Sequence, residues 1–399
     1  MPSSKNDRRI VHNNPLHTEP RATRFGEIKV VRRGPVNGDV SPEKARKQTM
    51  KTPHLSACLI FSAFLITTNT ANAQDTVEEY LREYPNQEQV KMMNTWLEKY
   101  EKGTFQFTGL VDPSDATVVT PQATVNYGYN WFSVSDGPAI INAVKYDKFF
   151  SVSIFDMKHN IPAVIVNPEK PILIKRPDQK MPEGDFHVVS LETDQGLALT
   201  RMVVDNNLDE VNKLSKELVM KGGKGDMTRN VQRFSPETDR KAHTVIDTVV
   251  SFVNPDDAFG KVSGDVSFLN LAAGVKIGQL GTPPDTVRYG TILTDDKGQP
   301  LKGDATYIAT VPAGLNEKSG YFSVTLYGTD NKLLIPNKKK VYDQTTFSAE
   351  PNEDGTYTLT FSPSGEGKNG IPTGKDFYGV LRAYVPSPNA IMKVSVKKQ

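Results

Sequence analysis

Short stretches in which apolar and polar side chains alternate fill much of the chain after residue 104, and this feature limits the possible folds most strongly. In "FFSVSIF", from Phe149 to Phe155, serines alternate with large apolar residues, and "YFSVTLYG" and "TYTLTF" repeat the pattern nearer the C-terminus. A period of two is typical of strands that bury one face. Turn-forming dipeptides such as Asp354-Gly355 separate the stretches. The sequence therefore predicts a mainly β chain built of sandwiches or barrels.

Two segments depart from this alternation and predict helices. Residues 74–103 place apolar side chains three and four positions apart on both sides of Pro85, which predicts two helices, the second ended by Gly103. Residues 197–285 are predicted to form a small helical layer. Its three helical patterns cover residues 208–220, 238–253 and 267–279.

The resulting domain organisation has one β domain on each side of the helical layer. Residues 104–196 are predicted to form an N-terminal β-sandwich-like domain. Residues 286–399 have room for about eight strands, the number that a jelly roll needs. The predicted fold class is thus mainly β with a helical middle, and its C-terminal domain is a jelly-roll-like β-sandwich.

An export signal starts at Met50 with "MKTPHLSACLIFSAFLITTNTANAQ". It has a positive charge at Lys51, an apolar run over 59–66 and small residues before the expected cleavage between Ala73 and Gln74. The run has about half of the roughly 20 residues that cross a bilayer. We therefore interpret residues 50–73 as a cleaved signal peptide and expect a periplasmic or secreted protein with no membrane span after cleavage.

Residues 1–49 are rich in arginine and lysine and poor in large apolar side chains, so they are predicted to be disordered. Our hypothesis is that Met50 is the true start and that residues 1–49 come from a misassigned start codon. The alternative is an unusually long region ahead of the apolar run. The single cysteine, Cys58, lies in the signal, so the mature chain is expected to have no disulfide.

The charge balance argues against a nucleic-acid partner. Residues 1–73 hold 12 of the 48 basic residues and 5 of the 46 acidic ones. The remaining 36 basic and 41 acidic residues give the mature chain a net charge of −5. No broad basic field is left to attract nucleic acid.

Sequence motifs for cofactors and metals are weak. "GEGKNG" at 365–370 has the spacing of a dinucleotide-binding loop, but such a loop must open a helix and a strand is predicted next, so a hairpin loop is favoured. The mature chain has three widely spaced histidines and no cysteine, so no metal site and no cofactor is predicted. No nucleophilic serine elbow is present.

Aromatic and charged side chains on or beside the predicted strands are candidate ligand-binding residues. Tyr127 and Trp131 lie on one face of a strand, although packing against the helical layer is the structural alternative. His159 follows a strand, where a loop can present it. Arg288 or Arg382 can pair with an acid across the domain junction or hold an anionic ligand bidentately. The full set of candidates is Tyr127, Trp131, Asp136, His159, Arg288, Tyr342, Arg382 and Tyr384.

Longer stretches in both halves are recognisable as a pair of domains. In the first half they include "VVTPQATVNYGYNWFSVSDGPAII" and "TRMVVDNNLDEVNKL", and in the second "GYFSVTLYGTDNKLLIPN" and "DFYGVLRAYVPSP". From about residue 105 onward, the chain resembles the tandem bacterial family of the domains of unknown function twelve-fifty-four and twelve-fourteen. The resemblance implies an N-terminal β domain, a helical middle, a C-terminal jelly-roll-like sandwich and no settled activity.

The chain departs from that family at two places. Relatives tend to have Asn-x-Asp-Thr after Thr-Pro, but here Gln122-Ala-Thr124-Val follows, so a carboxylate is missing at Thr124. The family's Asn-x-x-Arg-Tyr becomes a run of lysines before Val341-Tyr342, so an arginine is displaced. The tyrosines Tyr127 and Tyr342 remain.

Three functions are compatible with these features. The leading interpretation is an exported protein that binds a small molecule or envelope component between its two β domains. The alternatives are a hydrolase-type enzyme with an Asp/His/Tyr site and a structural or partner-binding envelope protein. A pocket joining Tyr127, Asp136, His159 and Arg382 would favour binding or catalysis, whereas a flat, packed junction would favour the structural role.

Overall fold

The computed structural model describes residues 75–114 and 120–399, and residues 75–399 belong to one compact unit. The predicted signal peptide and residues 1–49 lie outside the described residues. The α-helices are α1 (Val77–Leu97), α2 (Leu208–Glu217), α3 (Pro236–Val250) and α4 (Phe268–Gly278). None of the helices in the described part of the chain combines the length and the apolar character needed to span a bilayer.

The N-terminal β domain contains two sheets. The five-stranded sheet is antiparallel and has the order β1 (Gln106–Phe107), β2 (Val125–Ser133), β8 (Gln195–Val203), β4 (Phe150–Asp156) and β5 (Ala163–Val166). The four-stranded sheet has the order β7 (His187–Ser190), β6 (Ile172–Lys175), β3 (Ala139–Ile141) and β9 (Met220–Lys221). A shared core, with Phe132 and Met202 from one sheet and Ile141 and Ile174 from the other, lies between them.

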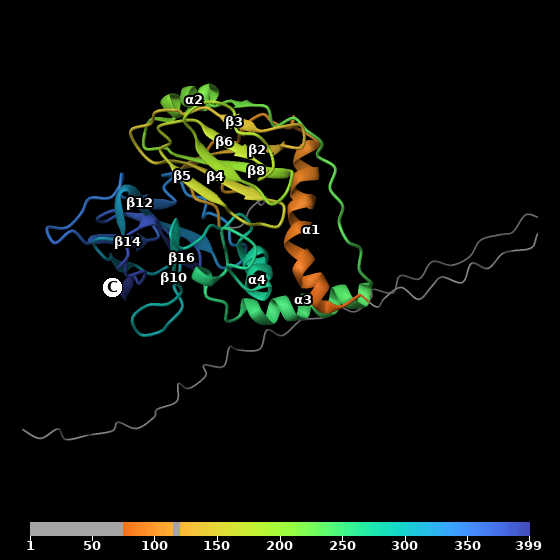
Figure 1. Cartoon of the computed structure of the whole chain (residues 1–399). Coiled ribbons are helices and arrows are strands. Elements are labelled where there is room, and N and C mark those ends of the chain that lie inside the picture. The colour runs from red at the N-terminus through yellow and green to blue at the C-terminus, as the bar shows by residue number, and fades with distance from the viewer. Residues whose placement is uncertain (1–74, 115–119) are drawn as a thin grey trace, which may run out of the picture. The chain divides into compact units, whose positions relative to one another are not determined.

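The second face of the five-stranded sheet is covered by helices. Trp131 and Leu197 on that face share a core with Leu81 of α1 and Ile246 of α3. Figure 1 shows α1, α3 and α4 together on this side of the sheet, with α2 on the opposite side. The five-stranded sheet is therefore buried on both faces.

Burial on both faces explains why β8 was missed by the sequence analysis, which placed the start of the helical layer at residue 197. Leu197 and Leu199 face the helices, whereas Ala198 and Met202 face the second sheet. A strand with apolar residues on both faces has no period of two to distinguish it from a buried helix. The boundary predicted between residues 196 and 197 lies inside β8.

Helix α1 is also longer than predicted, because it continues through Pro85 as one helix. A proline inside a helix removes a hydrogen bond and costs about 3 kcal/mol. Buried Tyr84 and Val90 on either side of Pro85 compensate for that cost by packing in the helical core. Thr76 and Glu79 fix the start of the helix through a reciprocal capping box.

The C-terminal domain consists of two four-stranded sheets that enclose one core. The first has the order β10 (Val287–Ile292), β16 (Phe377–Pro386), β12 (Asn316–Gly328) and β13 (Asp343–Thr345). The second has the order β15 (Ile371–Pro372), β14 (Tyr357–Ser362), β11 (Tyr307–Val311) and β17 (Ser395–Lys398). Phe322 and Leu381 of the first sheet meet Leu359 and Phe361 of the second in this core.

The predicted fold class is confirmed: the described chain is mainly β, with helices between two β domains. Eight strands in two sheets form the C-terminal sandwich, and their jelly-roll connectivity stays a prediction. The glycine-rich stretch at 365–370 is a loop between β14 and β15 that opens no helix. These two strands pair in parallel rather than as a hairpin.

Candidate functional site at the domain junction

The first sheet of the C-terminal domain uses its outer face to contact the N-terminal domain. Val125 and Val203 from the N-terminal domain form one apolar cluster with Val287, Tyr321 and Tyr384 from the C-terminal domain. The rings of Tyr321 and Tyr384 stack with centroids 4.4 Å apart and an interplanar angle of 2°. This cluster joins the two β domains.

Polar side chains occupy the same outer face beside the apolar cluster. On β12, Ser323, Thr325 and Tyr327 alternate with core residues, and all three are fully buried. The outer face of an antiparallel sheet usually meets water. Because this one is covered, each polar group on it needs a partner inside the protein.

Gln122, in the segment before β2, supplies many of these partners. Its Oε1 accepts hydrogen bonds from Ser323 Oγ (2.9 Å) and Thr325 Oγ1 (3.4 Å). Its Nε2 donates to Asp343 Oδ2 (3.0 Å), which also accepts from Thr124 Oγ1 (3.1 Å). A loop of the N-terminal domain is thereby fixed to the polar face of the C-terminal sheet.

Asp343 has the environment of an acid that titrates near neutrality. Burial raises the pKa of its carboxyl to about 7, although the hydrogen bond from Thr124 and the positive charge of Arg382 oppose the rise. The carboxyl therefore exchanges a proton close to physiological pH.

Arg382 lies beside this carboxyl and is 7% exposed. Its Nη2 donates to Thr120 O (2.7 Å), and its Nη1 donates to Tyr327 OH (3.0 Å). Longer contacts of 3.5 Å reach Gln122 Oε1 and Thr325 Oγ1. These partners are all neutral, and among the described residues Arg382 forms no ion pair.

Arg201, on β8, is a second buried guanidinium, 8% exposed. It donates to Ser153 Oγ (2.8 Å) and to Leu280 O (3.2 Å), and its guanidinium carbon lies 6.0 Å from the centre of the Tyr127 ring. Within residues 75–114 and 120–399 it too has no carboxylate partner at ion-pair distance. Both domains thus contribute a buried arginine that is held by neutral groups.

The two arginines are arranged in the same way. Arg201 is the register partner of Tyr127 on β2, and Arg382 is the register partner of Tyr289 on β10. Burial raises the pKa of Tyr384, and the charges of Arg382 and Arg201 both oppose this rise. Tyr384 is therefore within electrostatic reach of both arginines. We call Arg201, Arg382, Tyr127, Tyr289 and Tyr384 the junction cluster.

The structure brings only part of the predicted residue set together. Tyr127, Arg382 and Tyr384 are members of the junction cluster. Tyr342 lies next to it, packed against a small core that contains Tyr327.

Other candidates lie elsewhere and already have structural partners. Trp131 is buried against the helices. Asp136 is exposed in a turn, where it accepts a hydrogen bond from Ser135 Oγ (3.0 Å). Arg288 pairs with Asp256 (3.1 Å) and thus fastens the 3₁₀ turn at 255–257 to β10.

His159 is buried rather than presented by a loop. It packs between the rings of Phe155 and Phe259, and its Nε2 accepts a hydrogen bond from Leu280 N (3.1 Å). Burial lowers the pKa of His159 to about 4, so the ring is neutral at physiological pH. His159 and Asp136 therefore lie in surroundings different from those of Arg382.

Sequence analysis missed three important residues of the junction: Gln122, Arg201 and Asp343. Arg201 could have been recognised from the sequence, because it is a charged residue inside the apolar run "QGLALTRMV". A charge that is buried in such a run needs hydrogen-bond partners from the protein or from a ligand. Gln122 was named only as part of a departure from the family, and Asp343 had no signal, because their contact joins positions 221 residues apart.

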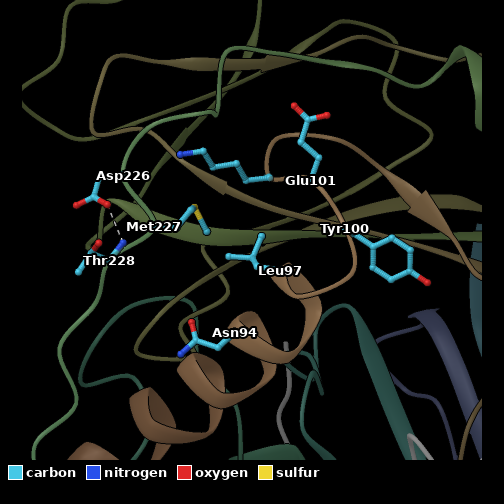
Figure 2. A pocket seen from close by; sticks show the side chains of 8 residues that line it. Asn94, Leu97, Tyr100, Glu101, Asp226, Met227 and Thr228 are labelled. Carbon is cyan, nitrogen blue, oxygen red and sulfur yellow. Dashed lines mark hydrogen bonds between the residues drawn. The ribbon is translucent and has the colours of Figure 1, made fainter.

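A separate open hollow of about 550 Å³ lies where α1 ends beside residues 226–228 (Figure 2). Its charged side chains are already engaged. Glu101 pairs with Lys224 (2.8 Å), Lys102 donates to Gly225 O (2.6 Å), and Asp226 accepts from Thr228 N (2.9 Å). The junction cluster is therefore the stronger candidate site.

These features define a class of protein: two β domains with helices between them and a buried polar junction. The chain belongs to a tandem family. The family model "Protein of unknown function (DUF1254)" matches residues 103–222, and "Protein of unknown function (DUF1214)" matches residues 286–388. The order of the two domains is the one that the sequence resemblance implied.

One solved structure supports the fold. The VPA0106 protein from Vibrio parahaemolyticus is 18% identical, with a TM-score of 0.66 over 80% of this chain and 98% of that chain. An uncharacterized protein from Burkholderia cenocepacia is 12% identical, with a TM-score of 0.45 over 81% of this chain and 88% of that chain. A search of curated proteins gives no match.

Proposed function

We propose that the protein is exported and binds a small anionic molecule at the junction cluster. The observation that carries the proposal is the pair of buried arginines, one from each β domain, with neutral partners only. A buried charge that is hydrogen-bonded only to neutral groups is costly, and a bound anion lowers that cost. Guanidinium groups suit carboxylates because they can donate two parallel hydrogen bonds.

The tyrosines indicate which anions fit best. Tyr127 and Tyr289 are partly exposed, whereas their register partners Arg201 and Arg382 are buried. A ligand that approaches from the two tyrosines can contact their rings and reach a guanidinium. Planar aromatic carboxylates offer both a ring and an anionic group.

Calorimetric titration of the full chain tests this function, with benzoate as the probe and benzamide as its neutral counterpart. Benzoate is expected to bind and to raise the melting temperature, whereas benzamide does neither. Arg382→Gln should weaken benzoate binding by about tenfold or more, since one charged hydrogen-bonded pair contributes roughly 1.5–3 kcal/mol.

Two further variants keep this test decisive. Arg288→Gln is the matched control, because Arg288 is also on a strand of the same sheet but pairs with Asp256. Tyr289→Ala changes a partly exposed residue and tests the site if Arg382→Gln fails to fold. Equal binding of benzoate and benzamide, or no effect of either site variant, would overturn the proposal in favour of a structural role for the packed junction.

Asp343 favours a second candidate function, acid–base catalysis of the hydrolase type. A carboxyl whose pKa is about 7 can both accept and donate a proton at neutral pH. Screening of nitrophenyl esters between pH 6 and 8, with Asp343→Asn beside the unmodified chain, tests this candidate. Turnover that Asp343→Asn leaves unchanged would rule Asp343 out.

Export is supported by the signal sequence and by the position of α1. The capped start of α1, at Thr76, comes directly after the expected cleavage between Ala73 and Gln74. N-terminal sequencing of the protein isolated from cells is expected to find Gln74 first. A cellular protein that retains Arg8 and Arg9 would contradict this expectation.

A further inference from the structure

The N-terminal domain has a groove that is separate from the junction cluster. It has a volume of about 560 Å³ and is formed by residues 103–107, the end of α2 and residues 218–224. Sites for small molecules commonly have volumes of roughly 300–1,000 Å³. None of its lining residues belongs to the junction cluster.

The floor of the groove is apolar and only partly covered. Phe105 and Phe107 lie with ring centroids 6.2 Å apart, and both pack on the core between the two N-terminal sheets. The Phe107 ring sits over Gly128, where any Cβ would come within 2.5 Å of the ring. Val219, at the edge of the groove, is 56% exposed. Apolar surface of this kind is typical of a binding site.

Met220 makes the floor adaptable. Its Sδ lies 3.6 Å from Asn130 Nδ2, and the Oδ1 of the same amide is buried without a hydrogen-bond partner in the described part of the chain. A methionine side chain changes shape easily and fills irregular spaces. Movement of Met220 would enlarge the groove above Asn130, and it would break only a weak N–H to sulfur hydrogen bond.

The charged side chains that line the groove are basic. Lys216, in the last turn of α2, and Lys224 both lie in the lining, which contains no aspartate or glutamate. Lys224 pairs with Glu101 (2.8 Å), whereas Lys216 forms no ion pair within the described residues. An exposed lysine beside an apolar floor complements a molecule that has one acidic end and one apolar end.

We propose that this groove binds a single-chain amphiphile of the fatty-acid type. The carboxylate meets Lys216, and the alkyl tail lies over Phe105, Phe107 and Met220. The charge of Lys216 selects the head group, and the apolar floor provides affinity through burial of the tail.

Titration of the full chain with dodecanoate, below its micelle concentration, tests the proposal by calorimetry. Dodecyltrimethylammonium has the same tail and the opposite charge. Saturable binding of dodecanoate and clearly weaker binding of the ammonium compound are expected. Lys216→Glu should weaken dodecanoate binding by about tenfold, which corresponds to ~1.4 kcal/mol.

Variants inside and outside the groove test whether dodecanoate binds there. Lys213→Glu makes the same charge change on α2 outside the lining and should leave dodecanoate affinity unchanged. Val219→Asp alters an exposed position, so it tests the apolar floor without disturbing the core, and it should weaken binding. Equal binding of the two amphiphiles, or insensitivity to both Lys216→Glu and Val219→Asp, would overturn the proposal.

Discussion

Arg201 and Arg382 show how strand register can prepare a site from single side chains. Each lies on an inner strand of its sheet, opposite a tyrosine on the neighbouring strand. Hydrogen bonds to neutral protein groups hold both guanidinium groups in place in the absence of a ligand. Preorganised charges of this kind lose little free energy when a ligand binds.

Because the pKa of Asp343 is raised in the folded protein, we expect the free energy of unfolding to fall as the pH rises. Its folded pKa of about 7 is above the ordinary value of 3.8. The stabilisation is therefore complete below pH 3.8 and is lost as the pH rises through about 7, a change of roughly 4 kcal/mol. In urea unfolding at pH 5 and pH 8, Asp343→Asn should reduce this loss, whereas Asp136→Asn, at an exposed site, should not. An unchanged profile for Asp343→Asn would contradict the prediction.

Because the pKa of His159 is lowered in the folded protein, we expect the free energy of unfolding to fall as the pH falls in the acid range. Its folded pKa of about 4 is below the ordinary value of 6.5. The stabilisation is therefore present above pH 6.5 and is lost as the pH falls through about 4, by roughly 3 kcal/mol. His159→Gln keeps an acceptor for Leu280 N and should flatten the acid side of the stability profile. His187→Gln, on β7, is the control and should retain the acid loss.

At the scale of elements, the sequence predicted strands best where apolar side chains alternate with small polar ones, as they do in β4 and β12. The predicted strand pattern at 149–155 overlaps β4 (Phe150–Asp156), and α2 begins at the predicted Leu208. The errors came from long-range packing. β8 was missed because both of its faces carry apolar side chains, and α1 passes through Pro85 because its neighbours are fixed in the helical core.

The N-cap of helix α3 is a local sequence feature whose contribution to stability can be tested. Ser235 caps the helix by accepting a hydrogen bond from Thr238 N (3.1 Å). Ser235→Ala should lower the free energy of unfolding by about 1 kcal/mol, because it leaves this amide without its cap. Thr244→Ala, at an exposed position in the same helix, should cost less than half as much in the same urea titration. Equal losses would show that the cap does not stabilise α3.

For the whole molecule, the buried junction predicts that the two β domains unfold together. Tyr384→Ala removes a ring from the apolar cluster that joins them and should cost about 3–5 kcal/mol. Calorimetry should show one transition for the unmodified chain and separate transitions for Tyr384→Ala. Tyr384→Phe keeps the ring and should retain a single transition. Two transitions in the unmodified chain would contradict this prediction.

The fold class and domain order could be predicted from alternation and family resemblance, but the candidate site could be predicted only in part. Tyr127, Arg382 and Tyr384 were selected as aromatic or charged residues in strands. The contact of Gln122 with Asp343 depends on how the two domains meet, and the burial of His159 depends on Phe259 and Leu280. Neither arrangement leaves a local pattern in the sequence.

The main chain of Leu280 links the helical cover to the junction. Its N–H donates to His159 and its carbonyl accepts from Arg201, only two residues after α4 ends. Mutations in α4 that shift Leu280 would displace Arg201 without touching any ligand contact. For the proposed anion site, we therefore expect substitutions in α4 to change affinity although they lie outside the site.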